Sequence, residues 1–99
     1  MKKITIATFA LSINFLMAFS ANHKTSSEGK LLYEKNCVVC HGIDGSLCLN
    51  GAKNLKKSNL TLEKTIKKIA KGGLKMPAFQ SLLTTEQIIS LSKYTISLR

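Results

Sequence analysis

The stretch CVVCH, residues 37–41, decides the fold of this 99-residue chain, because two cysteines and a histidine at this spacing serve three chemistries. A structural zinc site needs four ligands, usually including a second close Cys/His pair, and the residues after 20 add only Cys48 and His23. A thioredoxin-like dithiol requires a strand before the motif, whereas a helical pattern precedes this one. The motif therefore favours covalent haem attachment, in which two thiols bond the porphyrin edge and the adjacent imidazole binds the iron.

A haem iron that carries electrons also needs a second protein ligand, typically a methionine. After residue 20 the sequence contains one methionine, Met76, which stands beside the only proline, Pro77. An isolated methionine in a loop stiffened by proline is an unusual choice for filling a core. We predict that Cys37 and Cys40 form the haem thioethers and that His41 and Met76 are the axial ligands of the iron.

The first 20 residues have the layout of a secretory signal. Lys2 and Lys3 precede an uncharged, mostly apolar run, and the small residues Ala18 and Ser20 occupy the positions that a signal peptidase recognises. We expect cleavage after Ser20 and export to the periplasm. An uncleaved anchor is the alternative, although an apolar run of about 16 residues reaches only ~24 Å, short of the ~30 Å hydrocarbon core. No later segment is expected to insert stably into a membrane.

The chain after the signal is expected to form a flexible tail, residues 21–27, and one domain, residues 28–99. Below about 70–80 residues, a lone hydrophobic core rarely gives sufficient stability. Three cysteines are an odd number, which argues against a disulfide framework. A large bound group is therefore expected to complete the core, and the apoprotein is expected to be largely unfolded.

Hydrophobic periodicity predicts a small all-α domain. A first helix is expected over residues 27–36, with Leu31, Leu32 and Tyr33 facing inward, followed by an irregular loop over residues 42–59. The next helix, residues 62–71, has Thr61 as its N-cap and the apolar positions Leu62, Ile66, Ile69 and Ala70. A capping box at residues 84–87 opens the last helix, which extends to about Leu98 and has Ile88, Leu91, Thr95 and Leu98 on one face.

Charge points to the kind of partner. Without Lys2 and Lys3, 13 Lys and Arg residues stand against five Asp and Glu residues, a formal charge of +8. Such a charge favours acidic partner surfaces and rapid, salt-sensitive association. No nucleic-acid-binding motif is present, so nucleic acid is not an expected partner.

The chain from about residue 28 to residue 98 resembles the class I c-type cytochromes, small monohaem electron carriers. The resemblance rests on residues 29–33 (GKLLY), 37–42 (CVVCHG), 44–45 (DG), 76–79 (MPAF) and Tyr94. It implies three to five short helices wrapped around one covalently attached haem c, whose edge reaches the surface. It also implies that Gly29 and Tyr33 pack across the last helix near Tyr94.

This resemblance implies a one-electron carrier in a respiratory or periplasmic chain, with iron cycling between Fe(III) and Fe(II), and not an enzyme. Its partners would be acidic surfaces of redox proteins such as a terminal oxidase or a dehydrogenase. The lysines expected to ring the haem edge are Lys35, Lys53, Lys56, Lys57, Lys71 and Lys75. The alternatives are a haem-based gas sensor or weak peroxidase with a labile sixth ligand, and a dedicated haem subunit of a dehydrogenase.

Two positions depart from the family pattern. Family members usually have a proline where this chain has Lys53, and the carbonyl of that proline accepts a hydrogen bond from the haem histidine. The carbonyl of Lys53 or of Ala52 is expected to take this role. Cys48 is an unpaired thiol, read either as a small buried hydrophobic residue or as the site of an intermolecular disulfide. A monomer is expected, with a dimer through Cys48 as the alternative.

Overall fold

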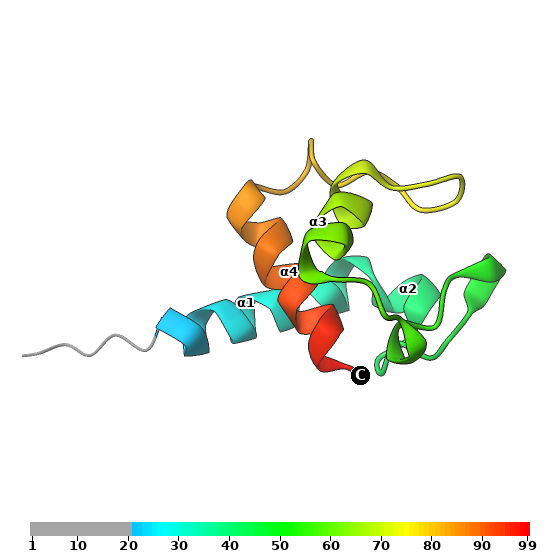
Figure 1. Cartoon of the computed structure of the whole chain (residues 1–99), viewed down its shortest axis with the longest axis horizontal. Coiled ribbons are helices and arrows are strands. Elements are labelled where there is room, and N and C mark those ends of the chain that lie inside the picture. The colour runs from blue at the N-terminus through cyan, green and yellow to red at the C-terminus, as the bar shows by residue number, and fades with distance from the viewer. Residues whose placement is uncertain (1–20) are drawn as a thin grey trace, which may run out of the picture.

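The computed structural model describes residues 21–99, which form helices joined by loops (Figure 1). The elements in chain order are α1 (Ala21–Asn36), α2 (Val38–His41), the 3₁₀ turns η1 (Leu49–Gly51) and η2 (Leu55–Lys57), α3 (Leu62–Lys71) and α4 (Thr85–Ser97). No strand occurs within residues 21–99, and the predicted all-α class is confirmed. The predicted signal segment, residues 1–20, lies outside the described residues.

The crossing of α1 and α4 forms the centre of the fold, and α3 packs against α4 (Figure 1). Gly29 lies at the crossing, where a Cβ atom would be only 2.4 Å from the carbonyl oxygen of Ser90. One turn further along α1, the ring of Tyr33 packs against that of Tyr94, with 5.2 Å between the ring centroids. The expected packing of Gly29 and Tyr33 against the last helix is therefore present. Glycine is required here because it lets the two helix backbones approach.

Tyr33 also connects this crossing to the cysteine motif. Its side chain is fully buried, and its hydroxyl group donates a hydrogen bond of 2.5 Å to the carbonyl oxygen of Gly42, directly after the motif. Burial is the main reason that the pKa of Tyr33 is raised to about 12. The phenol therefore stays neutral and keeps α1 attached to the end of α2 at ordinary pH.

Tyr33→Phe should reduce the free energy of unfolding by about 1–2 kcal/mol, because it removes this hydrogen bond. The raised pKa gives the effect a pH dependence. Stability that depends on the neutral phenol is fully present below the unfolded-state pKa of 10.0 and is lost as the pH rises through the folded-state value of about 12. Guanidinium unfolding from pH 8 to pH 12 should therefore show the gap between wild type and variant narrowing above about pH 10. A gap that does not change with pH would contradict this assignment.

The first helix differs from its prediction in two ways. It begins at Ala21, so the segment 21–27, predicted as a flexible tail, is helical. The sequence contains no glycine or proline between Ala21 and Glu28 that would stop the helix from extending. The inward orientation of Leu31 is also wrong, since its side chain is 66% exposed. The inward face follows Gly29 and Tyr33, which are one turn apart, and Leu31 lies on the opposite side.

The later helices agree with the sequence patterns, except that Leu62, one of the apolar positions predicted for the helix over residues 62–71, is exposed. The hydroxyl oxygen of Thr61 accepts a hydrogen bond from the Lys64 N–H at 3.2 Å, and α3 covers the predicted residues. Thr84 and Gln87 form both hydrogen bonds of the predicted capping box at the start of α4. The buried apolar core consists of Tyr33, Cys37, Ile69, Phe79, Ile88 and Leu91.

The segment 42–59 is more ordered than the predicted irregular loop. It contains both 3₁₀ turns, and the side chain of Asn54 caps η2 by accepting a hydrogen bond from the Lys56 N–H at 3.0 Å. The Leu55 N–H donates to the carbonyl oxygen of Gly45 at 2.8 Å, which closes the segment on itself. Side-chain capping of this kind produces no periodic pattern of apolar residues. The hydrophobic periodicity of the sequence therefore does not reveal these 3₁₀ turns.

Within residues 21–99, none of the helices combines the length and the apolar character that crossing a membrane would require.

Candidate functional site

The cysteine motif forms a short helix directly after α1. The Cys37 N–H donates to the Tyr33 carbonyl at 2.8 Å, and the His41 N–H donates to the Cys37 carbonyl at 2.9 Å. Both cysteines and the histidine are therefore carried on one turn. Cys37 is buried, whereas Cys40 and His41 are half-buried. Burial is the main cause that raises the pKa of the Cys37 thiol to about 12, so this position favours an uncharged sulfur atom.

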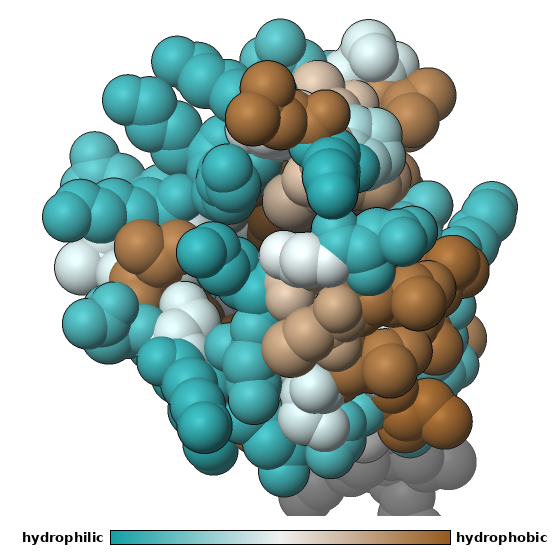
Figure 2. All heavy atoms as spheres, turned by 90° about the vertical axis from the view of Figure 1, so that its right-hand side faces the viewer, coloured by the Kyte–Doolittle hydropathy of each residue, from teal (hydrophilic) through white to brown (hydrophobic). Residues whose placement is uncertain are grey.

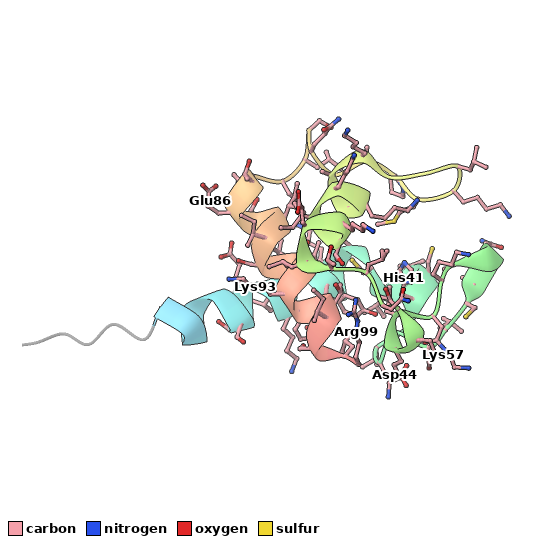
Figure 3. All side chains as sticks on the ribbon, in the orientation of Figure 1. His41, Asp44, Lys57, Glu86, Lys93 and Arg99 are labelled. Atoms are coloured by element: carbon pink, nitrogen blue, oxygen red, sulfur yellow. The ribbon has the colours of Figure 1, made fainter. Side chains whose placement is uncertain are left out.

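The imidazole of His41 is oriented by the backbone of the following segment. Its Nδ1 atom lies 2.9 Å from the carbonyl oxygen of Lys53. A carbonyl can only accept, so Nδ1 carries the proton and donates it, which leaves the Nε2 lone pair available for a metal. Of the two carbonyls expected for this role, that of Lys53 is the one used. Figure 3 shows His41 at the end of α2, on the same side of the molecule as Asp44 and Lys57.

The loop that carries Met76 folds back onto the end of α3. The Gly73 N–H donates to the Met76 carbonyl at 2.9 Å, and the Phe79 N–H donates to the Ile69 carbonyl at 3.1 Å. The buried side chain of Phe79 fixes the loop to the core, and Met76 is half-buried against the same core cluster. The backbone and the core therefore restrain both ends of the segment around Met76.

Gly72 makes this folding back possible. Its φ angle is +66°, a conformation that side chains disfavour. An added Cβ atom would be 2.4 Å from the carbonyl oxygen of Met76 and 2.7 Å from the carbonyl carbon of Pro77. Gly72, the C-cap of α3, therefore also determines the position of the Met76 backbone.

The Met76 loop and the segment after the motif meet at one end of the molecule. The ammonium group of Lys75 donates to the Asn50 carbonyl in η1 at 3.3 Å, a contact between positions 25 residues apart. In Figure 1 the loop after α3 extends over the end of the molecule where α2 and η1 lie. The fold therefore brings together the two segments that the sequence predicts to hold one haem.

The donor atoms and their surroundings fit a haem. Two thiols on one turn, an imidazole with a free Nε2 and a thioether match the attachment and ligation chemistry of c-type haem. Apolar side chains on the surrounding segments remain exposed, namely Val39, Ile43, Leu47, Leu49 and Leu74. Figure 2 shows hydrophobic atoms gathered along one side of this end of the molecule. A large apolar group bound here would cover part of this surface.

Two further sequence interpretations have clear outcomes. Cys48 is exposed, so its interpretation as a small buried hydrophobic residue is wrong. Its Sγ atom lies 3.6 Å from the Ser46 carbonyl oxygen.

The lysines proposed to ring the haem edge are all exposed. Among them, Lys56 lies 3.8 Å from the Asp44 carboxylate, and Lys75 makes the contact with Asn50 described above.

Comparison with known proteins gives consistent matches. A family model described as cytochrome c oxidase, cbb3-type, subunit III, matches residues 24–94. The cytochrome c6 of Rippkaea orientalis is 30% identical, and the match covers 98% of this chain and 94% of that protein. The cytochrome c6 of Leptolyngbya boryana is 34% identical over 72% of this chain and 89% of its own length.

Solved structures give the same result. Cytochrome c6 from the diatom Phaeodactylum tricornutum superposes with a TM-score of 0.65 at 26% identity, covering 73% of this chain and 91% of that one. Cytochrome c6C from Synechococcus sp. PCC 7002 superposes with a TM-score of 0.63 at 26% identity, covering 71% and 92%. The helical fold, the donor set and these relatives agree. The chain belongs to the class I c-type cytochromes, small electron carriers, and its cofactor is one covalently attached haem c with its iron.

Proposed function

We propose that this chain carries one electron at a time in a respiratory or periplasmic electron-transfer chain. Cys37 and Cys40 form the two haem thioethers, and His41 and Met76 occupy the axial positions of the iron. The haem iron supplies the chemistry by accepting one electron as Fe(III) and returning it as Fe(II). The protein supplies attachment, ligands and a surface that partners recognise.

The orientation of His41 is the observation that carries this proposal. The hydrogen bond from Nδ1 to the Lys53 carbonyl fixes the tautomer and the plane of the ring. A hydrogen bond of this kind also makes the ligating nitrogen more basic, which stabilises its bond to a metal. A histidine fixed beside two thiols on the same turn is what a permanently ligated haem requires.

The position of Met76 supports the second axial ligand. Its loop is restrained by Gly73, by Phe79 and by the contact between Lys75 and Asn50. A ligand fixed in this way changes position little between the two oxidation states, which keeps electron transfer rapid. With both axial positions held by the protein, oxygen and peroxide find no open coordination site. The chain is therefore proposed to be a carrier and not an enzyme.

Location and partners complete the proposal. Cleavage after Ser20 would release residues 21–99 into the periplasm, where the basic surface would meet acidic surfaces of a terminal oxidase or a dehydrogenase. The carrier acts as a monomer. A dimer linked through the exposed Cys48 is the alternative, and size-exclusion chromatography with and without a reductant separates the two states.

A spectroelectrochemical titration of protein matured with haem-attachment machinery tests the proposed function. We expect one reversible one-electron transition, with negligible peroxidase turnover. Mass spectrometry of the same sample should find one haem bonded to the peptide that contains Cys37 and Cys40. Substantial turnover of hydrogen peroxide would instead support the peroxidase alternative, and a protein without haem would exclude both functions.

Gly72→Ala should loosen the Met76 ligand, because the new Cβ atom would collide with the Met76 carbonyl and the Pro77 backbone. We expect the affinity of the oxidised protein for imidazole to rise by about tenfold or more, equivalent to ~1.4 kcal/mol of lost ligand stabilisation. Gly73→Ala is the matched control, since a Cβ there would meet only the flexible end of Lys68. Equal imidazole affinities for the two variants would contradict the role given to Gly72.

A further inference from the structure

Four of the exposed residues of α3 are lysines. Lys64, Lys67, Lys68 and Lys71 are all exposed and recur at helical spacing, so they form one row along the helix. The opposite face contributes Ile69 and other residues to the core. We name these four residues the α3 lysine row. Three of them were not singled out from the sequence, although lysine at positions i, i+3, i+4 and i+7 is a recognisable signal.

The α3 lysine row lies around a hollow in the surface. The hollow has a volume of about 310 Å³ and is lined by the four lysines together with Leu60 and Gly72. At the Leu60 end, the guanidinium group of Arg99 donates to the Leu60 carbonyl at 2.8 Å and adds a fifth positive charge. The four lysines therefore line a shallow, open depression, and Arg99 lies beyond its Leu60 end.

None of the ion pairs recorded in the described part of the chain involves this row. The ion pairs recorded among the side chains of residues 26–99 join Lys30 to Glu34 and Lys56 to Asp44. The only acidic residue of α3 is Glu63, in the first turn, where the helix dipole favours a negative charge. Like charges one turn apart repel and destabilise a helix. An external group with negative charge would remove this repulsion.

We propose that the α3 lysine row is the docking site for an acidic segment of the redox partner, whose carboxylates enter the hollow. The inference rests on the proposed function, because it identifies the surface that this carrier's partner recognises. Gly72 lines the hollow and also packs against the Met76 backbone. A partner bound to the row therefore lies beside the loop that carries the proposed iron ligand.

The structure favours an acidic protein segment over an anionic membrane. A helix that binds a membrane surface places apolar side chains against the lipid beside its basic ones. Ile66, Ile69 and Ala70 of α3 pack against the core. Leu60 is the one large apolar side chain lining the hollow. Two of the loop lysines are less suited to docking, because Lys56 pairs with Asp44 and Lys75 contacts Asn50.

Binding of an oligoglutamate peptide to the haem-loaded protein tests this proposal at low ionic strength. The variant Lys67→Gln/Lys68→Gln removes two charges from the row, and Lys56→Gln/Lys57→Gln removes two charges from η2 as a matched control. We expect the first pair to weaken peptide binding by about tenfold and the control by less than about twofold, since each exposed charge contact contributes modestly. Calorimetry gives both affinities.

Three results would overturn the proposal. Equal weakening in both variants would mean that net charge alone attracts the peptide. No binding of the peptide to the wild type at low salt would exclude an acidic segment at this site. The third result concerns the variant Lys67→Gln/Lys68→Gln. If it lost binding to vesicles of phosphatidylglycerol and phosphatidylcholine but kept the wild-type affinity for the peptide, the row would be a lipid site. The reduction potential of each variant distinguishes these three results from a failure of the proposed carrier function. Neither double substitution touches a proposed iron ligand, so a change in peptide binding does not depend on a change in the haem site.

Discussion

Replacing Met76 with alanine is expected to lower the reduction potential by about 100 mV or more, because axial ligands set haem potentials over a range of ~0.8 V. A thioether ligand stabilises the reduced iron and raises the potential. Without it, water or another weak ligand takes the sixth position, and the reduced protein should bind carbon monoxide. The haem should remain attached, since Cys37, Cys40 and His41 are unchanged.

Gln80→Ala is the matched control for this substitution. Gln80 lies in the same loop and is exposed, so the truncation of its side chain should leave the potential of the haem near that of the wild type. Both variants should be titrated by spectroelectrochemistry in the same buffer. A Met76→Ala protein that keeps the wild-type potential would show that another side chain is the sixth ligand.

Gly29→Ala should destabilise the folded protein by about 2 kcal/mol, although the same change usually stabilises a helix. Alanine gains ~0.5–1 kcal/mol over glycine within a helix, whereas overpacking in a close contact costs about 1–3 kcal/mol. At this position the close contact outweighs the helix preference, and the change in stability is unfavourable. The new Cβ atom would be 2.4 Å from the Ser90 carbonyl oxygen and 3.0 Å from the Tyr94 Cβ. The helices α1 and α4 would have to move apart.

Thermal unfolding of the haem-loaded protein measures this effect. A loss of about 2 kcal/mol lowers Tm by roughly 8–15 °C in a domain of this size. Leu31→Ala serves as the control on the same helix, because Leu31 is exposed and its truncation should change stability by less than ~0.5 kcal/mol. An unchanged or raised Tm for Gly29→Ala would mean that the helix crossing tolerates a side chain.

The sequence predicts well those elements whose signals are local. The helix over residues 62–71 and the capping box at Thr84 depend on the spacing of nearby residues, and both agree with the structure. The contact of Tyr33 with Tyr94 was expected through the family resemblance and not through any local pattern. Such a contact between distant segments has no signature in periodicity.

The features that the sequence predicted wrongly or did not predict have physical causes. The side of α1 that faces inward depends on which residues can approach α4, so Gly29 and not the apolar Leu31 marks it. A backbone carbonyl is present at every position, and only the fold selects Lys53 as the partner of His41. Burial of Cys48 could not be judged without knowing that residues 47–49 project into solvent.

The central claim is that protein side chains occupy both axial positions of the haem iron. The most direct test is to add carbon monoxide to the dithionite-reduced wild-type protein at neutral pH and record its visible spectrum. We predict an unchanged spectrum, because His41 and Met76 leave no position for the gas. A shifted Soret band would contradict the account and would support a haem protein with an open or labile sixth position.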